Sequence, residues 1–244
     1  MALESQSRRT IITIAAIAMI SLMLSLLFDI DLPCERASNT KTRTPLPEPR
    51  REGMVSVEAA IADRRSRREY GSGALSMAEL GQLLWAAQGI TARSSGFRAA
   101  PSAGATYPLE VYVVVGEPGV DGLETGIYLY DPESHSLSLV RSGDHQQDLR
   151  EAALDQEWIE RGAIDLAICA VDERTNKRYG ERGQRRYVPM EAGHAGENIY
   201  LQAEALDLAV VSVGAFQDDR VQTILDAPET QRPLSIYPVG KRPD

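Results

Sequence analysis

The feature that most constrains this chain is an apolar run near its start. Ile11–Phe28 contains no charged side chain, and only Thr13, Ser21 and Ser25 interrupt it. As a helix the run would be about 27 Å long, close to the hydrocarbon thickness of a bilayer. No A-x-A cleavage triplet follows it, so an uncleaved anchor is favoured over a cleaved signal peptide. We therefore expect one transmembrane helix at residues 11–28.

The flanking charges suggest an orientation. Arg8 and Arg9 precede the apolar run, whereas Asp29 and Asp31 follow it. The positive-inside rule then keeps residues 1–10 in the cytoplasm and places the body outside it, in the periplasm or beyond. The segment 7–12 also looks like a twin-arginine export signal, a route that carries folded proteins. Further basic residues beyond the run oppose this orientation, so the side that the body faces stays open.

The next segment divides the chain. Residues 29–52 carry Pro33, Pro45, Pro47 and Pro49 among polar side chains, which predicts a flexible, extended tether. Residues 53–244 are long enough for one domain with its own core. The formal charge of −9 argues against nucleic-acid binding. Two cysteines and three dispersed histidines give neither a disulfide scaffold nor a metal site.

The body alternates helical and strand patterns. The helices are expected at 54–63, 77–88, 145–154 and 191–206, and the strands at 109–115, 164–171, 208–213 and 235–239. Ser76 and Glu79 form a capping box for the second helix. Gly126–Tyr130 and Ser136–Val140 alternate polar and apolar residues about a turn, which predicts a hairpin. A hairpin among mixed elements indicates an α+β fold.

Four short segments could contribute to a binding site. Arg64–Arg68 contains four guanidiniums, which suit a phosphate but also suit a solvated helix end. Ala99–Pro108 is a small-residue loop whose backbone could approach a flat ligand, or a plain loop. Val211–Phe216 leaves a buried strand, where backbone amides can meet a planar ring. Pro238–Pro243 ends with two cations, which either join the first cluster or form a charged tail.

Taken in order, these segments resemble the FMN-dependent nitroreductase family, and most closely its SagB-type branch. The resemblance runs from Val57 to Pro243. It rests on the following residues: Arg64, Arg65, Ser66 and Arg68; the loop Pro101–Pro108; the hairpin Gly126–Pro132; Tyr179–Arg182 with Arg186 and Tyr187; the block Glu191–Asn198; Gly214–Phe216; and the closing Pro238–Lys241.

The resemblance implies a nitroreductase-like α/β sandwich with a mixed central sheet, preceded by the transmembrane helix. It implies a homodimer with FMN at the interface. By analogy, the phosphate and the ring edge are held by Arg64, Arg65, Ser66, Arg68, Lys241 and Arg242. The loop of Pro101, Ser102, Ala103 and Gly104 comes from the partner, and Gly214 approaches the ring.

Four residues bear on the chemistry. Azoline oxidases of this branch use a Lys-Tyr pair where this chain has Arg178-Tyr179. Arginine stays protonated and is a poor base, which argues against azoline oxidation. Tyr179 and His194 are weak catalytic candidates. Cys169, in an apolar strand, is expected to be an inert core residue.

The function implied is an FMN-dependent oxidoreductase that transfers two electrons through flavin N5 by a ping-pong mechanism. Its substrate is a small molecule or a peptide that the sequence does not identify. The donor is NAD(P)H or another reductant, because NAD(P)H is scarce outside the cytoplasm. The alternative is a non-catalytic, membrane-tethered flavin-binding module.

Overall fold

The computed structural model describes residues 43–243, which are built around one seven-stranded sheet. The strand order is β1-β6-β5-β4-β7-β9-β8. The bounds of these strands are Arg43–Pro45 (β1), Leu109–Val115 (β4), Gly126–Asp131 (β5), Ser136–Ser142 (β6), Ile164–Ala170 (β7), Leu208–Val210 (β8) and Arg232–Lys241 (β9). A separate small ribbon pairs β2 (Ile90–Ala92) with β3 (Phe97–Arg98).

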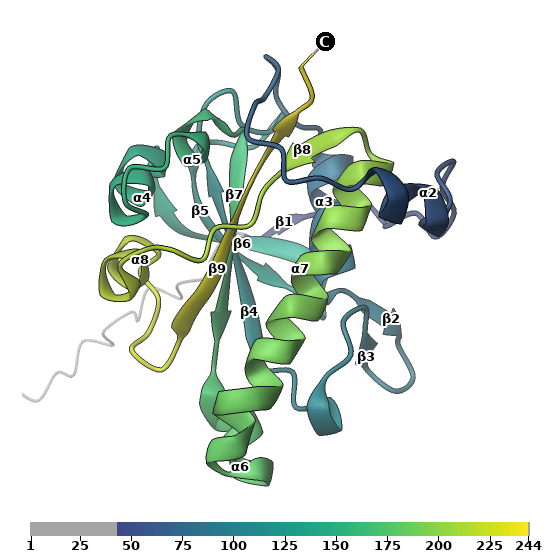
Figure 1. Ribbon diagram of the computed structural model, residues 1–244, viewed down its shortest axis with the longest axis vertical. Coiled ribbons are helices and arrows are strands. Elements are labelled where there is room, and N and C mark those ends of the chain that lie inside the picture. Colours follow the sequence, from purple (N-terminus) through teal and green to yellow (C-terminus); the bar gives the residue numbers. More distant parts are fainter. Residues whose placement is uncertain (1–42, 244) are drawn as a thin grey trace, which may run out of the picture. The chain divides into compact units, whose positions relative to one another are not determined.

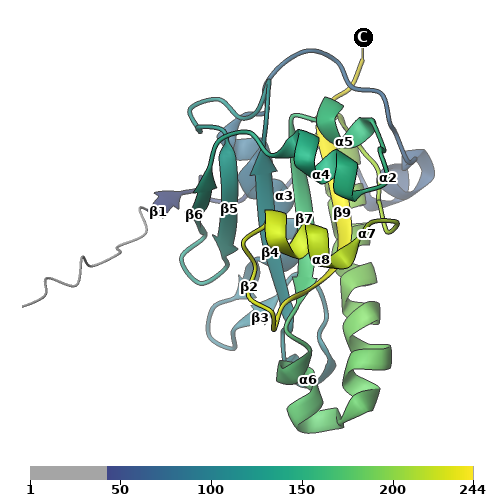
Figure 2. The same cartoon turned by 90° about the vertical axis from the view of Figure 1, so that its left-hand side faces the viewer.

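Helices cover both faces of the sheet (Figures 1 and 2). One face carries α3 (Met77–Gln88) and α7 (Val188–Ala205), and the other carries α4 (Gln146–Ala152), α5 (Trp158–Arg161) and α8 (Asp218–Ile224). The remaining helices are α2 (Val57–Asp63), α6 (Asp172–Tyr179), a short 3-10 turn at Ala103–Ala105 and a π turn at Gly183–Tyr187. The chain is therefore a three-layer α+β domain.

The sequence of β4 explains why two cores form. Its side chains alternate between the faces, since successive residues of a strand point in opposite directions. Val111 and Val113 join the core under α3 and α7, whereas Tyr112 and Val114 join the core under α4, α5 and α8. A run that is apolar at every position is what a strand covered on both sides requires.

The predicted mixed sheet is wrong for the part of the chain that the structure describes. Every pair of neighbouring strands in the seven-stranded sheet is antiparallel. The one parallel contact recorded is an isolated bridge between Leu75 and Val120, outside that sheet. The helices and loops that connect the strands reverse the direction of the chain. Neighbouring strands therefore run antiparallel, even where a helix connects them.

The C-terminal part of the predicted tether belongs to the folded body. Arg43–Pro45 is the edge strand β1 and pairs with β6, and Leu46 is buried. The Gln82 amide receives a hydrogen bond from Arg50 N–H at 2.8 Å and donates one to Arg50 O at 3.0 Å. Proline is tolerated here because an edge strand leaves one row of N–H groups unpaired.

The expected membrane helix at 11–28, with residues 1–10 before it and 29–42 after it, lies outside the described residues. Within residues 43–243, no helix combines the length and the apolar character that a membrane span needs.

Candidate functional site

The arginine-rich segment lies beside the end of β8. Helix α2 is capped at its start by Ser56, whose Oγ accepts a hydrogen bond from Ala59 N–H, and at its end by Arg64, where the backbone leaves the helical conformation. Arg67 N–H then donates to Val210 O at 2.9 Å. This bond fixes residues 64–68 against the last residue of β8, next to the segment that begins at Val211. Two of the four predicted segments are therefore neighbours.

Tyr200 of α7 joins these two segments. Its hydroxyl lies 3.0 Å from Ser66 Oγ and accepts a hydrogen bond from Ser212 N–H at 2.7 Å. The Arg64 guanidinium lies over the Tyr200 ring, 5.2 Å from its centroid. The ring itself is buried, so the tyrosine links residues 64–66 to the segment after β8, in which Ser212, Gly214 and Ala215 are exposed.

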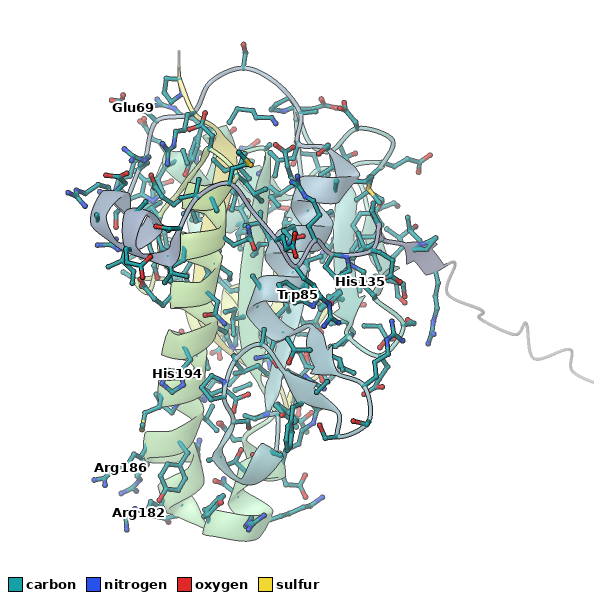
Figure 3. The ribbon with its side chains drawn as sticks, turned by 90° about the vertical axis from the view of Figure 1, so that its right-hand side faces the viewer. Glu69, Trp85, His135, Arg182, Arg186 and His194 are labelled. Atoms are coloured by element: carbon teal, nitrogen blue, oxygen red, sulfur yellow. The ribbon has the colours of Figure 1, made fainter. Side chains whose placement is uncertain are left out.

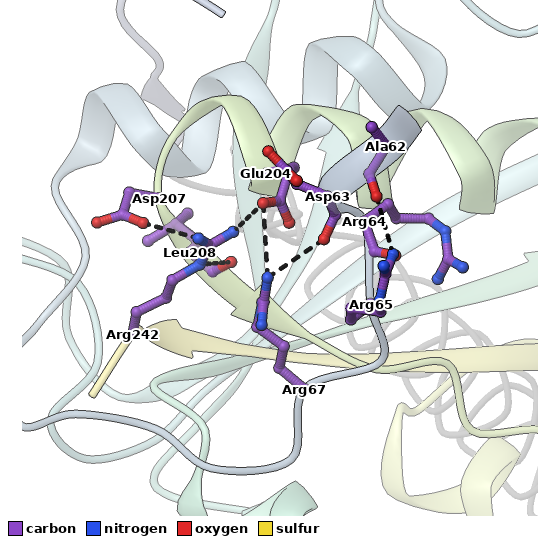
Figure 4. Close-up of polar contacts among 9 residues, drawn as sticks. All are labelled: Ala62, Asp63, Arg64, Arg65, Arg67, Glu204, Asp207, Leu208 and Arg242. Atoms are coloured by element: carbon purple, nitrogen blue, oxygen red, sulfur yellow. Dashed lines mark hydrogen bonds and ion pairs between the residues drawn. The ribbon is translucent and has the colours of Figure 1, made fainter. Parts of the chain in front are cut away.

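The C-terminal segment reaches the same region (Figure 4). Gly71 N–H donates to Lys241 O at 2.9 Å, which sets the chain after the arginine cluster alongside the end of β9. Arg67 and Arg242 both pair with Glu204, at 3.6 and 2.6 Å. The structure thus brings together three of the four predicted segments.

The cations of this region are not equally available. Lys241 pairs with Glu79 at 2.6 Å, and Arg242 pairs with Glu204 and with Asp207 at 3.0 Å. The two C-terminal cations predicted to bind phosphate are therefore engaged by carboxylates of this chain. The Lys241–Glu79 and Arg242–Glu204 pairs are only partly exposed, so solvent screens them less than it screens surface pairs, whereas Asp207 is exposed.

Arg65 and Arg68 differ from them. Arg65 Nη1 donates to the carbonyl oxygens of Ala62 and Arg64, and the Arg68 guanidinium lies 5.1 Å from the Trp158 ring centroid. Neither forms an ion pair with an acidic side chain among residues 43–243. Arg64 has only a 3.9 Å contact with the exposed Glu197. In the described residues, the guanidiniums of this segment that lack a close carboxylate are therefore those of Arg64, Arg65 and Arg68.

The loop Pro101–Gly104 lies elsewhere, against the start of α7. Ser102 Oγ accepts a hydrogen bond from Tyr107 N–H at 2.9 Å, which closes the loop. Gly104 has a φ of 60°, and a Cβ added there would lie 2.6 Å from the Tyr179 hydroxyl. Glycine suits this position, because a side chain would strain the backbone conformation and displace the Tyr179 hydroxyl.

Tyr179 and His194 are both placed near this loop. The Tyr179 ring packs edge-to-face on Tyr187 with centroids 4.9 Å apart. Arg178 Nη1 donates to Gly104 O at 3.4 Å. A pocket of about 220 Å³ lies between the loop and α7, lined by Pro101, Ser102, Ala103, Tyr187, Met190, Glu191 and His194.

The two groups are separate within one chain. Among residues 43–243, no hydrogen bond or ion pair joins the region around Tyr200 to the loop Pro101–Gly104. Figure 3 shows Glu69, near the first region, at one end of the molecule and Arg182 with Arg186 at the other, with His194 between them. Both groups nevertheless use the same helix, α7.

Comparison with known proteins identifies the fold. A protein-family sequence model described as "Nitroreductase family" matches residues 61–241, which is most of the chain. The chain belongs to the nitroreductase family. The protein "Putative nitroreductase MJ1384" of Methanocaldococcus jannaschii is 46% identical over 188 residues, covering 77% of this chain and 92% of that protein.

Two further likenesses extend the comparison. The crystal structure of a putative nitroreductase from Ralstonia eutropha superposes with a TM-score of 0.73 at 27% identity, covering 84% of this chain and 92% of that one. Trifolitoxin operon protein TfxC of Rhizobium leguminosarum bv. trifolii is 24% identical over 214 residues, covering 82% of this chain and 59% of that protein. Nitroreductase-family membership makes this chain an oxidoreductase of the flavin-using type.

Sequence reasoning missed Tyr200 of this nitroreductase-family site, and it named Glu191 only as the first residue of the block Glu191–Asn198, without its burial. Tyr200 carries no motif, because its role arises only when α7 packs against residues 64–66 and 212. Glu191 is an acid in the first turn of a helix, which is an ordinary helix-start pattern. Its burial comes from the loop Pro101–Gly104 and could not be read from α7 alone. Cys169 is fully buried, which raises the pKa of its thiol to about 12, as an inert core residue requires.

Proposed function

We propose that this chain is an FMN-dependent oxidoreductase of the SagB-type branch that works by a ping-pong mechanism. The observation that carries the proposal is the Tyr200 junction. It sets the arginine-rich segment 64–68 beside the segment 212–215, whose exposed backbone lies at Gly214 and Ala215, with the end of β9 next to both. A mononucleotide needs this pairing of a cationic end for its phosphate and an open backbone edge for its ring.

The donor set fits a phosphate. Arg65 and Arg68 have no carboxylate partner among residues 43–243, and Arg64 has only a distant one. Guanidiniums bind phosphate through charge-assisted, often bidentate, hydrogen bonds. In the proposal these three arginines and the Ser66 hydroxyl hold the phosphate. Lys241 and Arg242 act mainly by holding the surrounding backbone, because Glu79, Glu204 and Asp207 already neutralise them.

The ring would lie along residues 212–215. Ser212, Gly214 and Ala215 are exposed, and a Cβ added at Gly214 would meet nothing within 4 Å. When bound, the flavin supplies two-electron transfer at N5. The chain's own part is to fix the ring, to exclude water and to provide positive charge, which favours the anionic reduced ring.

A homodimer would complete the site. Met54, just before helix α2, and Val57 and Ile61 within it are exposed, whereas Ala60 is buried. Beside them lies a groove of about 280 Å³ whose walls include Trp85, Leu201 and Ala205. A second copy covering this apolar surface could carry its loop Pro101–Gly104 to the flavin of the first. The separation of the two groups within one chain supports this arrangement.

The loop Pro101–Pro108 and its neighbour Arg178 bear on the proposed branch and on the substrate. The run Pro101–Pro108 matches the SagB-type pattern, and the likeness to TfxC supports the same branch. Arg178 stands where azoline oxidases have lysine, and it is held against Gly104 O, so azoline oxidation is not proposed. The substrate is a small molecule or a peptide, and the donor is NAD(P)H or another reductant. We further propose that residues 11–28 anchor the domain to a membrane and that it lies outside the cytoplasm.

An absorbance spectrum of the purified full-length protein tests the proposal. The expected result is a flavin spectrum that bleaches under anaerobic conditions when a donor is added, and that returns when an acceptor follows. A flavin spectrum that no donor bleaches would instead indicate a flavin-binding module without catalysis. A colourless protein that also fails to take up added FMN would refute both.

A further inference from the structure

The corner between α4 and α5 contacts two segments of the proposed flavin site. The Gln156 side chain donates hydrogen bonds through Nε2 to Ala215 O at 2.8 Å and to Ala153 O at 2.7 Å. Two residues later, the Trp158 ring lies under the Arg68 guanidinium, whose carbon is 5.1 Å from the ring centroid. One short corner therefore contacts both the arginine-rich segment and the exposed backbone after β8, although these lie far apart in the sequence.

The corner and the segment after β8 are fixed to one another. Gln217 N–H donates to Ala152 O at 2.9 Å, so the backbone of that segment is bonded to the end of α4. Phe216 and Trp158 both pack against the core beneath α4, α5 and α8. Contact with a close-packed core restricts the orientations that a side chain can adopt. The indole of Trp158 is therefore held by the core while its ring meets Arg68.

A buried polar network anchors the helix that carries Trp158. Gln146 is 1% exposed, and its Nε2 donates to Gly162 O, just after α5, at 3.0 Å and to Asp165 Oδ2, on β7, at 2.9 Å. A Cβ added at Gly116 would lie 1.7 Å from Gln146 Oε1, so the glycine makes room for this amide. Leaving a buried polar group without its partner is costly, which makes such a network resistant to movement. Helix α5 is therefore a rigid support for Trp158.

Arg68 depends on this contact for its orientation. Among residues 43–243, its guanidinium forms neither a hydrogen bond nor an ion pair, whereas Arg65 donates to two backbone carbonyls and Arg67 pairs with Glu204. An arginine side chain loses considerable conformational freedom when it is held in one place. Stacking on Trp158 supplies the attraction, because a guanidinium is drawn to the negative face of an indole. The direction in which this guanidinium points is therefore set by Trp158.

We propose that Trp158 is a positioning residue that acts through Arg68. Stacking keeps the Arg68 guanidinium on the side of the site where Gln156 holds Ala215, next to the backbone along which the flavin ring would lie. The inference rests on the proposed function. It gives Arg68 a part in setting the relative affinity for reduced and oxidised flavin, as well as in binding the phosphate. Neither Trp158 nor Gln156 belongs to the segments that carry the family resemblance.

The electrostatic reason is that the reduced and oxidised rings differ in charge. A guanidinium held in one position at the ring favours the anionic reduced ring over the neutral oxidised ring. The same group, free to swing into solvent, acts over a longer distance and through a higher effective dielectric constant, so its effect on the ring falls. Loss of the indole should therefore lower the reduction potential of bound flavin without removing any charge from the protein.

The midpoint potential of the full-length holoenzyme tests this inference. In Trp158→Leu the potential of the bound FMN should fall by about 20 mV, which corresponds to an about fivefold lower preference for the reduced form in a two-electron couple. Trp158→Phe keeps an aromatic face and should retain most of the wild-type value. The affinity of flavin-stripped protein for oxidised FMN should fall only about twofold in Trp158→Leu.

A double-mutant cycle separates positioning from general damage to the fold. If Trp158 acts through Arg68, Trp158→Leu should lower the potential in the wild type and leave it unchanged in Arg68→Gln, where no guanidinium remains to be positioned. An equal drop in both backgrounds would overturn the proposal, because the tryptophan would then act on the flavin by another route. So would a potential that Trp158→Leu does not alter in the wild type.

The contact itself can be measured without flavin. The chain has two tryptophans, so Trp85→Phe leaves Trp158 as the only one. In flavin-stripped protein of this background, Arg68→Gln should shift the tryptophan emission maximum to longer wavelength, because the stacked guanidinium no longer shields the ring from water. Arg43→Gln, on the edge strand β1, should leave the maximum unchanged. A maximum that Arg68→Gln does not move would count against the proposed stacking.

The two proposals fail differently. If the purified wild type neither holds nor takes up FMN, the proposed function is wrong, whereas the emission measurement still reports whether Trp158 stacks on Arg68. If the wild type binds flavin and a donor bleaches it while the tryptophan variants keep its potential, the proposed function stands and Trp158 is only a structural residue.

Discussion

At the scale of single residues, the main lesson is that charge in the sequence is not the same as charge available to a ligand. By analogy with the family, six residues were predicted to hold the phosphate and the ring edge. Lys241 and Arg242 are engaged by carboxylates that lie far from them in sequence, on α3 and at the end of α7. Arg65 and Arg68 are not. Which cation is neutralised depends on packing between distant elements, so local sequence could not separate the two kinds.

This difference predicts unequal effects on flavin binding. Arg65→Gln and Arg68→Gln should each weaken FMN binding about 10- to 100-fold, since a hydrogen bond to a charged group is worth about 1.5–3 kcal/mol. Quenching of FMN fluorescence on titration into flavin-stripped protein measures this. Arg43→Gln is the matched control, because Arg43, on the edge strand β1, pairs with Asp131 at the opposite edge of the sheet from β8. Equal losses in all three variants would mean that residues 64–68 do not hold the phosphate.

Glu191 also predicts how stability depends on pH. Its folded-state pKa of about 7 lies above the ordinary value of 4.5, so the folded protein holds this proton more tightly than the unfolded chain does. The protonated carboxyl therefore contributes on the order of 3 kcal/mol to the free energy of unfolding below about pH 4.5. This contribution is lost as the pH rises to 7. Thermal melts at several pH values should show this decline in the wild type and a smaller one in Glu191→Gln. If the melting temperature depended on pH in the same way in both proteins, the raised pKa of Glu191 would be excluded.

At the scale of elements, local patterns predicted most of the fold. The capping box of Ser76 and Glu79 forms as expected, and the hairpin becomes β5 and β6. The long helix begins at Val188, before the expected Glu191, because the preceding π turn runs directly into it. Residues 43–50 escaped prediction because their order depends on partners far along the chain, on β6 and α3.

Removing this segment should destabilise the domain. A protein that starts at residue 43 should melt near the temperature of the full chain, whereas one that starts at residue 53 loses β1, the buried Leu46 and both hydrogen bonds to Gln82. Burial of a leucine contributes about 1.5–3 kcal/mol and an orphaned buried amide costs about 1–3 kcal/mol. We expect a fall of about 10 °C in the melting temperature. Identical melting of the two proteins would show that residues 43–52 are a tether after all.

At the scale of the whole molecule, one chain contains two groups of residues, and neither forms a complete site by itself. The region around Tyr200 offers cations and an open strand end, and the loop Pro101–Gly104 with Glu191 offers an apolar pocket with an acid. Both are built on α7, beside an apolar groove and the exposed Val57 and Ile61 of α2. In a symmetric dimer each residue of one copy meets the other copy's counterpart surface, so two shared sites arise together.

Sharing can be tested by complementation between damaged copies. The double substitution Arg65→Gln/Arg68→Gln should abolish phosphate binding, and Ala103→Trp should block the loop that the partner provides. Each homodimer should therefore be inactive. Differently tagged copies, coexpressed and purified as the mixed dimer, should regain about half of the wild-type activity, because both lesions then fall in one site and the other site is intact. The flavin content of the mixed dimer should likewise be about one per two chains. If each chain carried a complete site of its own, no mixed dimer could recover activity, and the two groups on α7 would have to be explained separately.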